Sequence, residues 1–410
     1  MNTALITFYK KYGYNQNIFY QDLIAGLTVG IVALPLSIAI AIASGASPDK
    51  GIITAVIGGF FISFFGGSKF QIGGPTGAFI VVVYSVISKH GYDGLLLATF
   101  LASFILFFCG LFKLGKLIEH VPHSVIMGFT SGISIILFTS QVKDFLGINL
   151  DQLPADFYHR WFIYFHNLNL IKASSIVIGV LTLAIILLQR KYFKKLPGFL
   201  IALSICTLVV YFFNLPVDTI GGKYPNMDIA FEAPSIPAWS TDKLIHVIPS
   251  AFTIAFLAGI ESLLCAVMAD KMTGKKHDPN QELVAQGISN FASSIFAGMP
   301  VTGALARTAT NIDAGAKSPV AGIIQSFFIL FFGFIAFDLI KFIPLASLAA
   351  VLFMVAYNMS EIKGFVLALN NSKSEFFVSI VTFLLTIFYS ILIAVVVGLV
   401  LYFLLLKLKK

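Results

Sequence analysis

The chain has 410 residues, of which 58% are hydrophobic and only 11% charged, whereas a soluble domain carries about 25% charged residues. Apolar runs long enough to cross a bilayer recur along most of the chain, which excludes a soluble fold and predicts an all-α polytopic membrane protein. The net charge of +8 does not indicate a nucleic-acid partner, because the lysines and arginines gather in short loops, as they do in membrane proteins.

The N-terminal residues 1–21 are predicted to be an amphipathic segment on the cytoplasmic surface, since aromatic and polar residues surround Lys10 and Lys11. Hydrophobicity begins only at Leu23, so no cleavable signal peptide is expected.

About 14 membrane crossings are predicted, at about 20 residues for a full span and fewer for a broken one. In the first half, residues 22–213, spans are expected at 22–44, 51–67, 70–88, 94–112, 122–141, 173–188 and 198–213. In the second half, residues 246–406, they are expected at 246–268, 281–296, 301–315, 319–337 and 344–358, followed by an amphipathic piece at 359–375 and a hydrophobic hairpin at 376–406.

The charges of the loops predict the orientation of the chain in the membrane. The loop 189–195 and the lysine-rich loop 269–280 are the most basic, so both are expected in the cytoplasm. The Pro-rich loop 214–245 is acidic and is expected outside, and the aromatic-rich stretch 142–172 is predicted to be a polar interfacial loop. The number of crossings then places both termini in the cytoplasm, including the basic end 407–410.

Two stretches interrupt predicted spans with proline and glycine, at residues 73–78 and 298–304. Proline removes a backbone donor and glycine weakens a helix, so a broken helix is predicted at each stretch. Irregular backbone inside a membrane is tolerated where protein or a watery cavity surrounds it. Breaks in corresponding positions of two halves indicate the binding site of an inverted-repeat transporter.

The residues after each proline are candidate substrate ligands. Thr76 and Thr302 offer hydroxyls, and the Gly-Ala backbone that follows each threonine offers N–H donors at the start of a half-helix. The positive end of a helix dipole favours anions. The two helix starts, if they face each other, therefore form a cradle for an anion.

Two ionisable residues lie inside predicted spans. Glu261 is near the middle of the span 246–268, where a charge costs several kcal/mol, on the order of 2.5 or more, and usually marks a transport pathway. Arg307 falls about one turn into the helix that follows the second break, where a cation strengthens an anion site. The alternatives are a structural glutamate bonded to a neighbouring helix and an arginine that extends to the cytoplasmic face.

Several motifs recur together along nearly the whole chain. They are Gly26–Gly30 with Ala33–Ala39, Ala43–Pro48, Gly66–Ser68, Ile72–Ala78, Gly128–Gly132 with Gln141–Gly147, Glu261–Leu263 and Pro300–Thr308. In this combination the sequence resembles the sulfate permease family of anion transporters.

The resemblance implies a uracil-permease-like fold, a seven-plus-seven inverted repeat with a core domain and a gate domain. In that fold the third and tenth spans begin as extended segments with the substrate between them. Thr76-Gly77-Ala78 and Gly303-Ala304-Leu305 would be the half-helix starts, Glu261 the eighth-span acid facing the site, and Arg307 the tenth-span arginine beside it. The resemblance also implies a homodimer, elevator-like motion and, in bacteria, location in the inner membrane.

The sequence departs from the family pattern at two places. Leu36 stands directly after the first-span proline, where many members have glutamine. Most members also carry a cytoplasmic STAS domain, of the kind shared with anti-sigma-factor antagonists, which is absent from the sequence up to Lys410.

We therefore expect a secondary active transporter of a small anion such as sulfate, bicarbonate or a dicarboxylate. Glu261 is expected to carry a coupling proton, because burial favours its neutral form, although Na+ coupling stays open. The alternatives are a proton-coupled nucleobase transporter of the same fold and a passive anion channel or motor. No enzyme, metal site or cofactor is expected, since no loop shows an acid–base pair or ligand spacing.

Overall fold

In the computed structural model of the chain, the structure describes residues 3–118, 121–150, 153–154, 156–193, 197–225 and 233–408. Some charged residues used above to predict orientation lie outside these ranges, namely Lys194, Lys195, Asp228, Glu232, Lys409 and Lys410.

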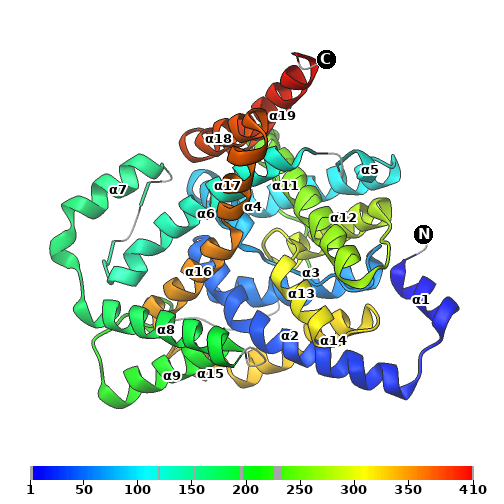
Figure 1. The fold of residues 1–410 in the computed structure, drawn as a ribbon. Helices are drawn as coiled ribbons and strands as arrows, with labels where there is room; N and C mark the ends of the chain where they lie inside the picture. The colour runs from blue at the N-terminus through cyan, green and yellow to red at the C-terminus, as the bar shows by residue number, and fades with distance from the viewer. Residues whose placement is uncertain are drawn as a thin grey trace. The chain divides into compact units, whose positions relative to one another are not determined.

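The described chain is almost entirely helical (Figure 1). Its first half contains α1 (Ala4–Tyr12), α2 (Gln16–Ala43), α3 (Pro48–Phe65), β1 (Gly73–Gly74), η1 (Gly77–Phe79), α4 (Ile80–Leu111), α5 (Gly115–Ile118), α6 (His123–Leu146), α7 (Phe157–His166), η2 (Leu168–Leu170), α8 (Ala173–Tyr192) and α9 (Gly198–Phe213). Its second half contains α10 (Ile220–Lys223), α11 (Thr241–Thr273), α12 (Pro279–Ile295), β2 (Thr302–Gly303), α13 (Leu305–Asp313), α14 (Val320–Ile335), α15 (Phe337–Ile340), α16 (Leu345–Met359), α17 (Ile362–Asn371), α18 (Lys373–Phe388) and α19 (Ile391–Leu408).

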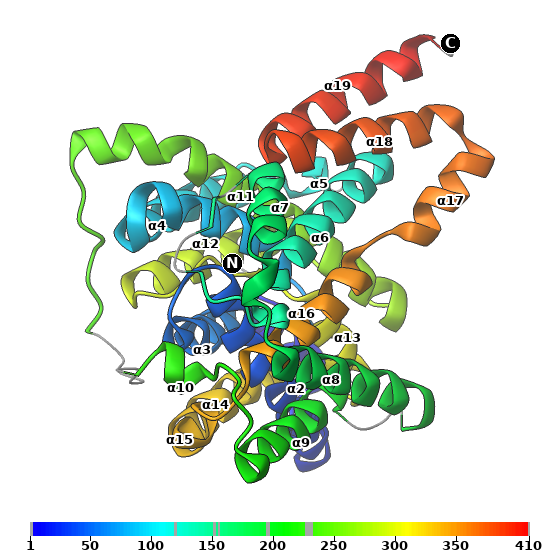
Figure 2. The ribbon, with the colours of Figure 1, turned by 90° about the vertical axis from the view of Figure 1, so that its left-hand side faces the viewer.

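Seven helices in the described ranges are long and apolar enough to cross a membrane, and α9, α14 and α19 are shorter apolar helices. The chain is thus a multi-pass helical membrane protein. The predicted hairpin at 376–406 is confirmed, because α18 ends at Phe388, α19 begins at Ile391, and the two helices lie side by side (Figure 2). The total of about 14 crossings and the boundaries of the two repeats stay predictions.

One predicted boundary agrees with the structure and one differs. The spans expected at 70–88 and 94–112 are separated within α4 by a break at Gly91, whose φ of 70° and ψ of 179° are not helical. The stretch 142–172 was wrongly predicted to be a loop throughout, since it contains α7. Tyr164 of this helix is only 2% exposed and donates a hydrogen bond to the carbonyl of Thr139, 3.0 Å away, on α6. Tertiary contacts thus support a helix that is short for one standing alone.

The described helices divide into two compact units, each built from both halves of the sequence. One unit contains α1–α5 and α10–α15, with α4 packed on α11 and α12, and α14 packed on α2 and α3. The other contains α6–α8, most of α9 and α16–α19, with α6 packed on α16 and α18. Both broken segments belong to the first unit.

A buried carboxylate joins α2 to the start of α14 inside the first unit. Asp22, which is fully buried, accepts hydrogen bonds from the backbone N–H groups of Lys317 (2.7 Å) and Ser318 (3.1 Å) and from the Ser318 hydroxyl (2.5 Å). The Tyr14 hydroxyl donates to the same carboxylate at 3.3 Å. Burial, and then the charge of Asp22, raises the pKa of the Tyr14 phenol, so the phenol stays neutral and acts as a donor.

Replacement of Asp22 by alanine is expected to lower the free energy of unfolding by about 3 kcal/mol, because buried donors lose their acceptor. The measurement is the melting temperature of the purified protein in detergent. Asp338→Ala is the matched control, since that side chain is 88% exposed and forms an ion pair with Lys341, three residues further along the chain. Equal melting temperatures for the Asp22→Ala variant and the wild type would contradict this role.

Candidate functional site

Both helix breaks predicted from proline and glycine are confirmed. After α3 the chain stays non-helical until η1 begins at Gly77, and after α12 it stays non-helical until α13 begins at Leu305. Between these points β1 and β2 pair antiparallel, with Gly73 opposite Gly303 and Gly74 opposite Thr302. The N–H of Ala304 extends the ladder by donating to the carbonyl of Ile72 at 2.8 Å. The starts of the two half-helices are thereby held next to each other.

Glycine leaves room for two side chains where these strands approach their neighbours. Gly74 has φ +148°, and a β-carbon on it would lie 2.5 Å from Nη1 of Arg307. A β-carbon on Gly303 would lie 2.1 Å from Nε2 of Gln71. Both distances are shorter than any normal carbon–nitrogen contact. The glycines therefore allow a guanidinium and an amide to lie directly against the strand backbone.

The starts of the two half-helices lack side-chain caps. Thr76 precedes η1 with φ −126° and ψ 156°, and its side chain makes no capping hydrogen bond. Ala304 precedes α13 and has no side-chain group that could cap the helix. The Thr76 hydroxyl is buried without a hydrogen-bond partner among the described residues. Hydrogen-bond donors thus remain at the positive ends of two helix dipoles.

Arg307 is the cation of this region. It lies in α13, is 2% exposed, and donates through Nη2 to the carbonyl of Pro75. Its Nε and Nη1 atoms are buried and have no hydrogen-bond partner within the described ranges. Burying a guanidinium with unused donors is costly unless an acceptor occupies the site. The arrangement is therefore suited to an anion with several oxygen atoms.

Glu261 lies on α11, the helix that packs against β2. It is 6% exposed, and in the described part of the chain its carboxyl group makes neither a hydrogen bond nor an ion pair. Arg307 is therefore not its partner. One turn earlier on α11, the carbonyl of Ala258 accepts a hydrogen bond of 2.9 Å from the Thr302 hydroxyl.

The predicted site residues differ in what the structure leaves accessible. Gly77, Ala78, Gly303 and Ala304 are buried at the half-helix starts, while Leu305 is 40% exposed. The Thr302 hydroxyl is committed to α11, so Thr302 fixes β2, whereas the Thr76 hydroxyl is free to bind. Their roles as substrate ligands stay predictions.

Sequence reasoning missed the polar side chains that hold the extended segments in place. The Thr308 hydroxyl accepts from the N–H of Ile72 at 2.9 Å, and Asn311 donates to the carbonyl of Phe70 at 2.9 Å. Asn290 on α12 bonds both the N–H and the carbonyl of Val301, each at 2.9 Å. The missed signal was a polar stripe at helical spacing on the predicted span 281–296, formed by Glu282, Gln286, Asn290 and Ser293.

The fold and this site define a multi-pass helical membrane protein with two unwound helix starts paired in its interior. The sequence profile described as "Sulfate permease family" matches residues 19–382, and the chain belongs to this family. The predicted resemblance is confirmed. The family is one of transporters rather than enzymes.

Relatives and solved structures agree with this assignment. The chain is 44% identical over 392 residues to the Bacillus subtilis protein named "Putative sulfate transporter YvdB", covering 95% of this chain and 74% of the relative. It is 31% identical over 396 residues to the bicarbonate transporter BicA of Picosynechococcus, covering 92% and 68% of the two chains. The solved transmembrane domain of a cyanobacterial BicA superposes with a TM-score of 0.82 at 30% identity, covering 95% of this chain and 98% of that domain.

Proposed function

We propose that this protein is a secondary active transporter of small anions, with sulfate, bicarbonate and dicarboxylates as the candidate substrates. The observation that carries the proposal is the buried guanidinium of Arg307, whose Nε and Nη1 have no partner among the described residues and whose Nη2 is bonded to the carbonyl of Pro75, the residue before Thr76. The names of the relatives support the substrate class, since two of them are named for sulfate and bicarbonate transport.

Binding would exchange the hydration shell of the anion for donors that the fold already holds in position. One oxygen atom would accept from the Thr76 hydroxyl, and others from Arg307 and from the backbone N–H groups of the first turns of η1 and α13. Charge-assisted hydrogen bonds are roughly twice as strong as neutral ones. The pairing of β1 with β2 keeps both sets of donors together, so little ordering is needed when the anion binds.

Glu261 would couple this binding to a proton. Among the described residues its carboxyl group has no partner to stabilise the charged form, and a charged Glu261 near the site would repel an anion. Protonation removes that repulsion, so the proton and the anion favour each other's binding, which is the thermodynamic requirement for symport.

We further propose elevator-like motion, a homodimeric assembly, and location in the bacterial inner membrane with both termini in the cytoplasm.

Uptake into proteoliposomes tests the proposal. Labelled sulfate, bicarbonate and fumarate are presented with an inward proton gradient, an inward Na+ gradient or neither, and empty liposomes serve as the control. We expect gradient-dependent accumulation of at least one anion. Uptake of uracil alone would instead identify a nucleobase transporter, and large gradient-independent anion currents in planar bilayers would identify a channel.

A further inference from the structure

We propose that Glu282 is the positioning residue of the anion site. It fixes β1 and α11 through one buried hydrogen-bond network, defined by Glu282, Gly67, Ser68, Gln71, Ser262 and Gln286. The inference rests on the proposed function, since it concerns the same site. It assigns a role to a buried acid that does not contact the anion.

Glu282 lies in the first turn of α12 and is fully buried. Its Oε2 accepts hydrogen bonds from the backbone N–H groups of Gly67 (3.0 Å) and Ser68 (3.2 Å), which follow α3. Its Oε1 accepts from the Ser262 hydroxyl (3.1 Å) and from Nε2 of Gln286 (3.1 Å). Donors from the segment after α3, from α11 and from α12 itself thus satisfy both carboxyl oxygens and hold the side chain in one position.

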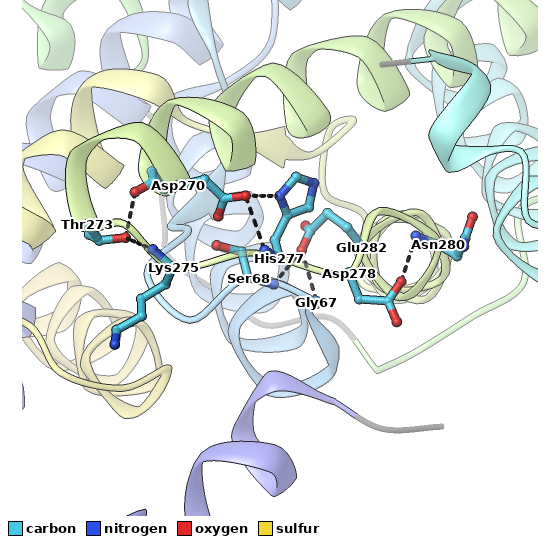
Figure 3. A network of polar contacts seen from close by, with 10 residues as sticks. Gly67, Ser68, Asp270, Thr273, Lys275, His277, Asp278, Asn280 and Glu282 are labelled. Atoms are coloured by element: carbon cyan, nitrogen blue, oxygen red, sulfur yellow. Dashed lines mark hydrogen bonds and ion pairs between the residues drawn. The ribbon is translucent and has the colours of Figure 1, made fainter. Parts of the chain in front are cut away.

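Figure 3 shows how the chain closes around this residue. Gly67 and Ser68 point their N–H groups at the Glu282 carboxylate, and the connection between α11 and α12 passes beside them. The N–H of Asp278 donates to the carbonyl of Gly67 at 3.2 Å. A β-carbon on Gly67 would lie 2.1 Å from the carbonyl oxygen of Asp278, so only glycine permits the contact. The same connection is held by a hydrogen bond of 2.8 Å between Nδ1 of His277 and the carboxylate of Asp270.

The network reaches the anion site through Ser262 and Gln71. The Ser262 hydroxyl accepts hydrogen bonds from Nε2 of Gln71 at 2.6 Å and Nε2 of Gln286 at 2.7 Å while donating to Glu282. Gln71 stands two residues before β1, and its amide lies against Gly303 of β2. Ser262 follows Glu261 on α11. Glu282 therefore fixes, through one hydroxyl, the entry to β1 and the helix that carries the proposed coupling acid.

Small displacements here would be costly for binding. A shift of about 1 Å in a positioned group can reduce activity about a hundredfold. The link from Ser262 to Gln71 is a single side-chain bond, whereas the fold of the unit also depends on extensive helix packing. Loss of that link should move Thr76 relative to Arg307 while leaving the protein folded. A residue that only stabilised the fold would lower the melting temperature and leave the KM of the surviving protein unchanged.

The experiment compares Ser262→Ala, Gln71→Leu and Glu282→Gln with the control Gln281→Leu. Gln281 is the neighbour of Glu282, is also buried, and donates to the carbonyl of Phe65 at 2.7 Å, but it does not belong to the network. Uptake of the transported anion gives KM and maximal rate, and hydrogen–deuterium exchange gives the protection of residues 71–78. Melting temperatures report folding.

We expect Ser262→Ala and Gln71→Leu to raise KM about tenfold and to accelerate exchange over residues 71–78 about tenfold, the effect of losing about one hydrogen bond. Their maximal rate and melting temperature should stay close to those of the wild type. Glu282→Gln should raise KM and accelerate exchange more strongly, because the N–H groups of the new amide would face the N–H and O–H donors that bind the carboxyl group in the wild type. Gln281→Leu should leave KM and exchange in this segment unchanged.

Unchanged KM and unchanged exchange in Ser262→Ala and Gln71→Leu would overturn the inference, as would equal effects in Gln281→Leu. The proposed function and the positioning role of Glu282 can be contradicted independently of each other. A wild-type protein that takes up none of the anions contradicts the proposed function, while the exchange measurement still decides whether the network positions β1.

Discussion

Replacement of Arg307 by alanine is expected to reduce the ratio of maximal uptake rate to KM for the transported anion about a hundredfold or more. Two nitrogen atoms of the buried guanidinium, Nε and Nη1, have no hydrogen-bond partner among the described residues. A hydrogen bond to a charged group contributes about 1.5–3 kcal/mol, so two such bonds contribute about 3–6 kcal/mol. Each 1.4 kcal/mol is about a tenfold change in affinity. The measurement is initial uptake into proteoliposomes across a range of anion concentrations.

Two further variants separate anion binding from general effects of charge and folding. Arg307→Lys keeps the charge but loses the planar arrangement of donors, so it should retain an intermediate activity. Lys317→Ala removes one positive charge from the segment after α13, where the side chain is exposed, and should have little effect. Near-normal uptake by Arg307→Ala would show that its donors do not face the substrate.

Replacement of Glu261 by glutamine is expected to abolish proton-driven accumulation while preserving exchange of the anion across the membrane. Glutamine has the shape of a protonated glutamate but cannot release a proton, so binding of the anion is no longer linked to pH. With one coupled proton and a pH difference of about two units, the wild type can concentrate the anion up to about a hundredfold. The variant should not concentrate it at all. Both are measured with the membrane potential clamped at zero.

The exchange measurement is the control for this prediction. Liposomes loaded with unlabelled anion should take up labelled anion through Glu261→Gln at a rate comparable with that of the wild type, which shows that the site is intact. Accumulation driven by the proton gradient in Glu261→Gln would exclude Glu261 as the coupling group. Wild-type accumulation that responds to Na+ and not to pH would assign the coupling to sodium.

The two helix breaks could be predicted because their cause is local. Pro75 and Pro300 each remove a backbone donor, and the adjacent glycines disfavour a helix wherever they occur. The register between β1 and β2 could not be predicted in the same way. Gly73 and Gly303 are brought together by the packing of whole helices, and neither stretch alone specifies its partner. The resemblance to a family supplied the expectation that the two stretches meet.

The residues that sequence reasoning missed have a different physical origin. Glu282 in the first turn of α12 resembles an ordinary acid at the solvated start of a helix, a position that the helix dipole favours. Its complete burial depends on the close approach of Gly67 and Ser68, more than 200 residues earlier in the chain. Likewise, α7 has only ten residues and many aromatic side chains, so its helix becomes evident only when Tyr164 is seen packed on α6.

Direct binding of anion to the purified protein tests the central claim, that the anion is held where the two broken helices meet. Equilibrium binding of labelled sulfate, bicarbonate and fumarate is compared in the wild type, Arg307→Ala, Thr76→Val and the control Lys317→Ala. We predict saturable binding of one anion per chain that is lost in Arg307→Ala, weakened in Thr76→Val and unchanged in Lys317→Ala. Saturable binding with the same affinity in all four proteins would place the anion elsewhere and contradict the account.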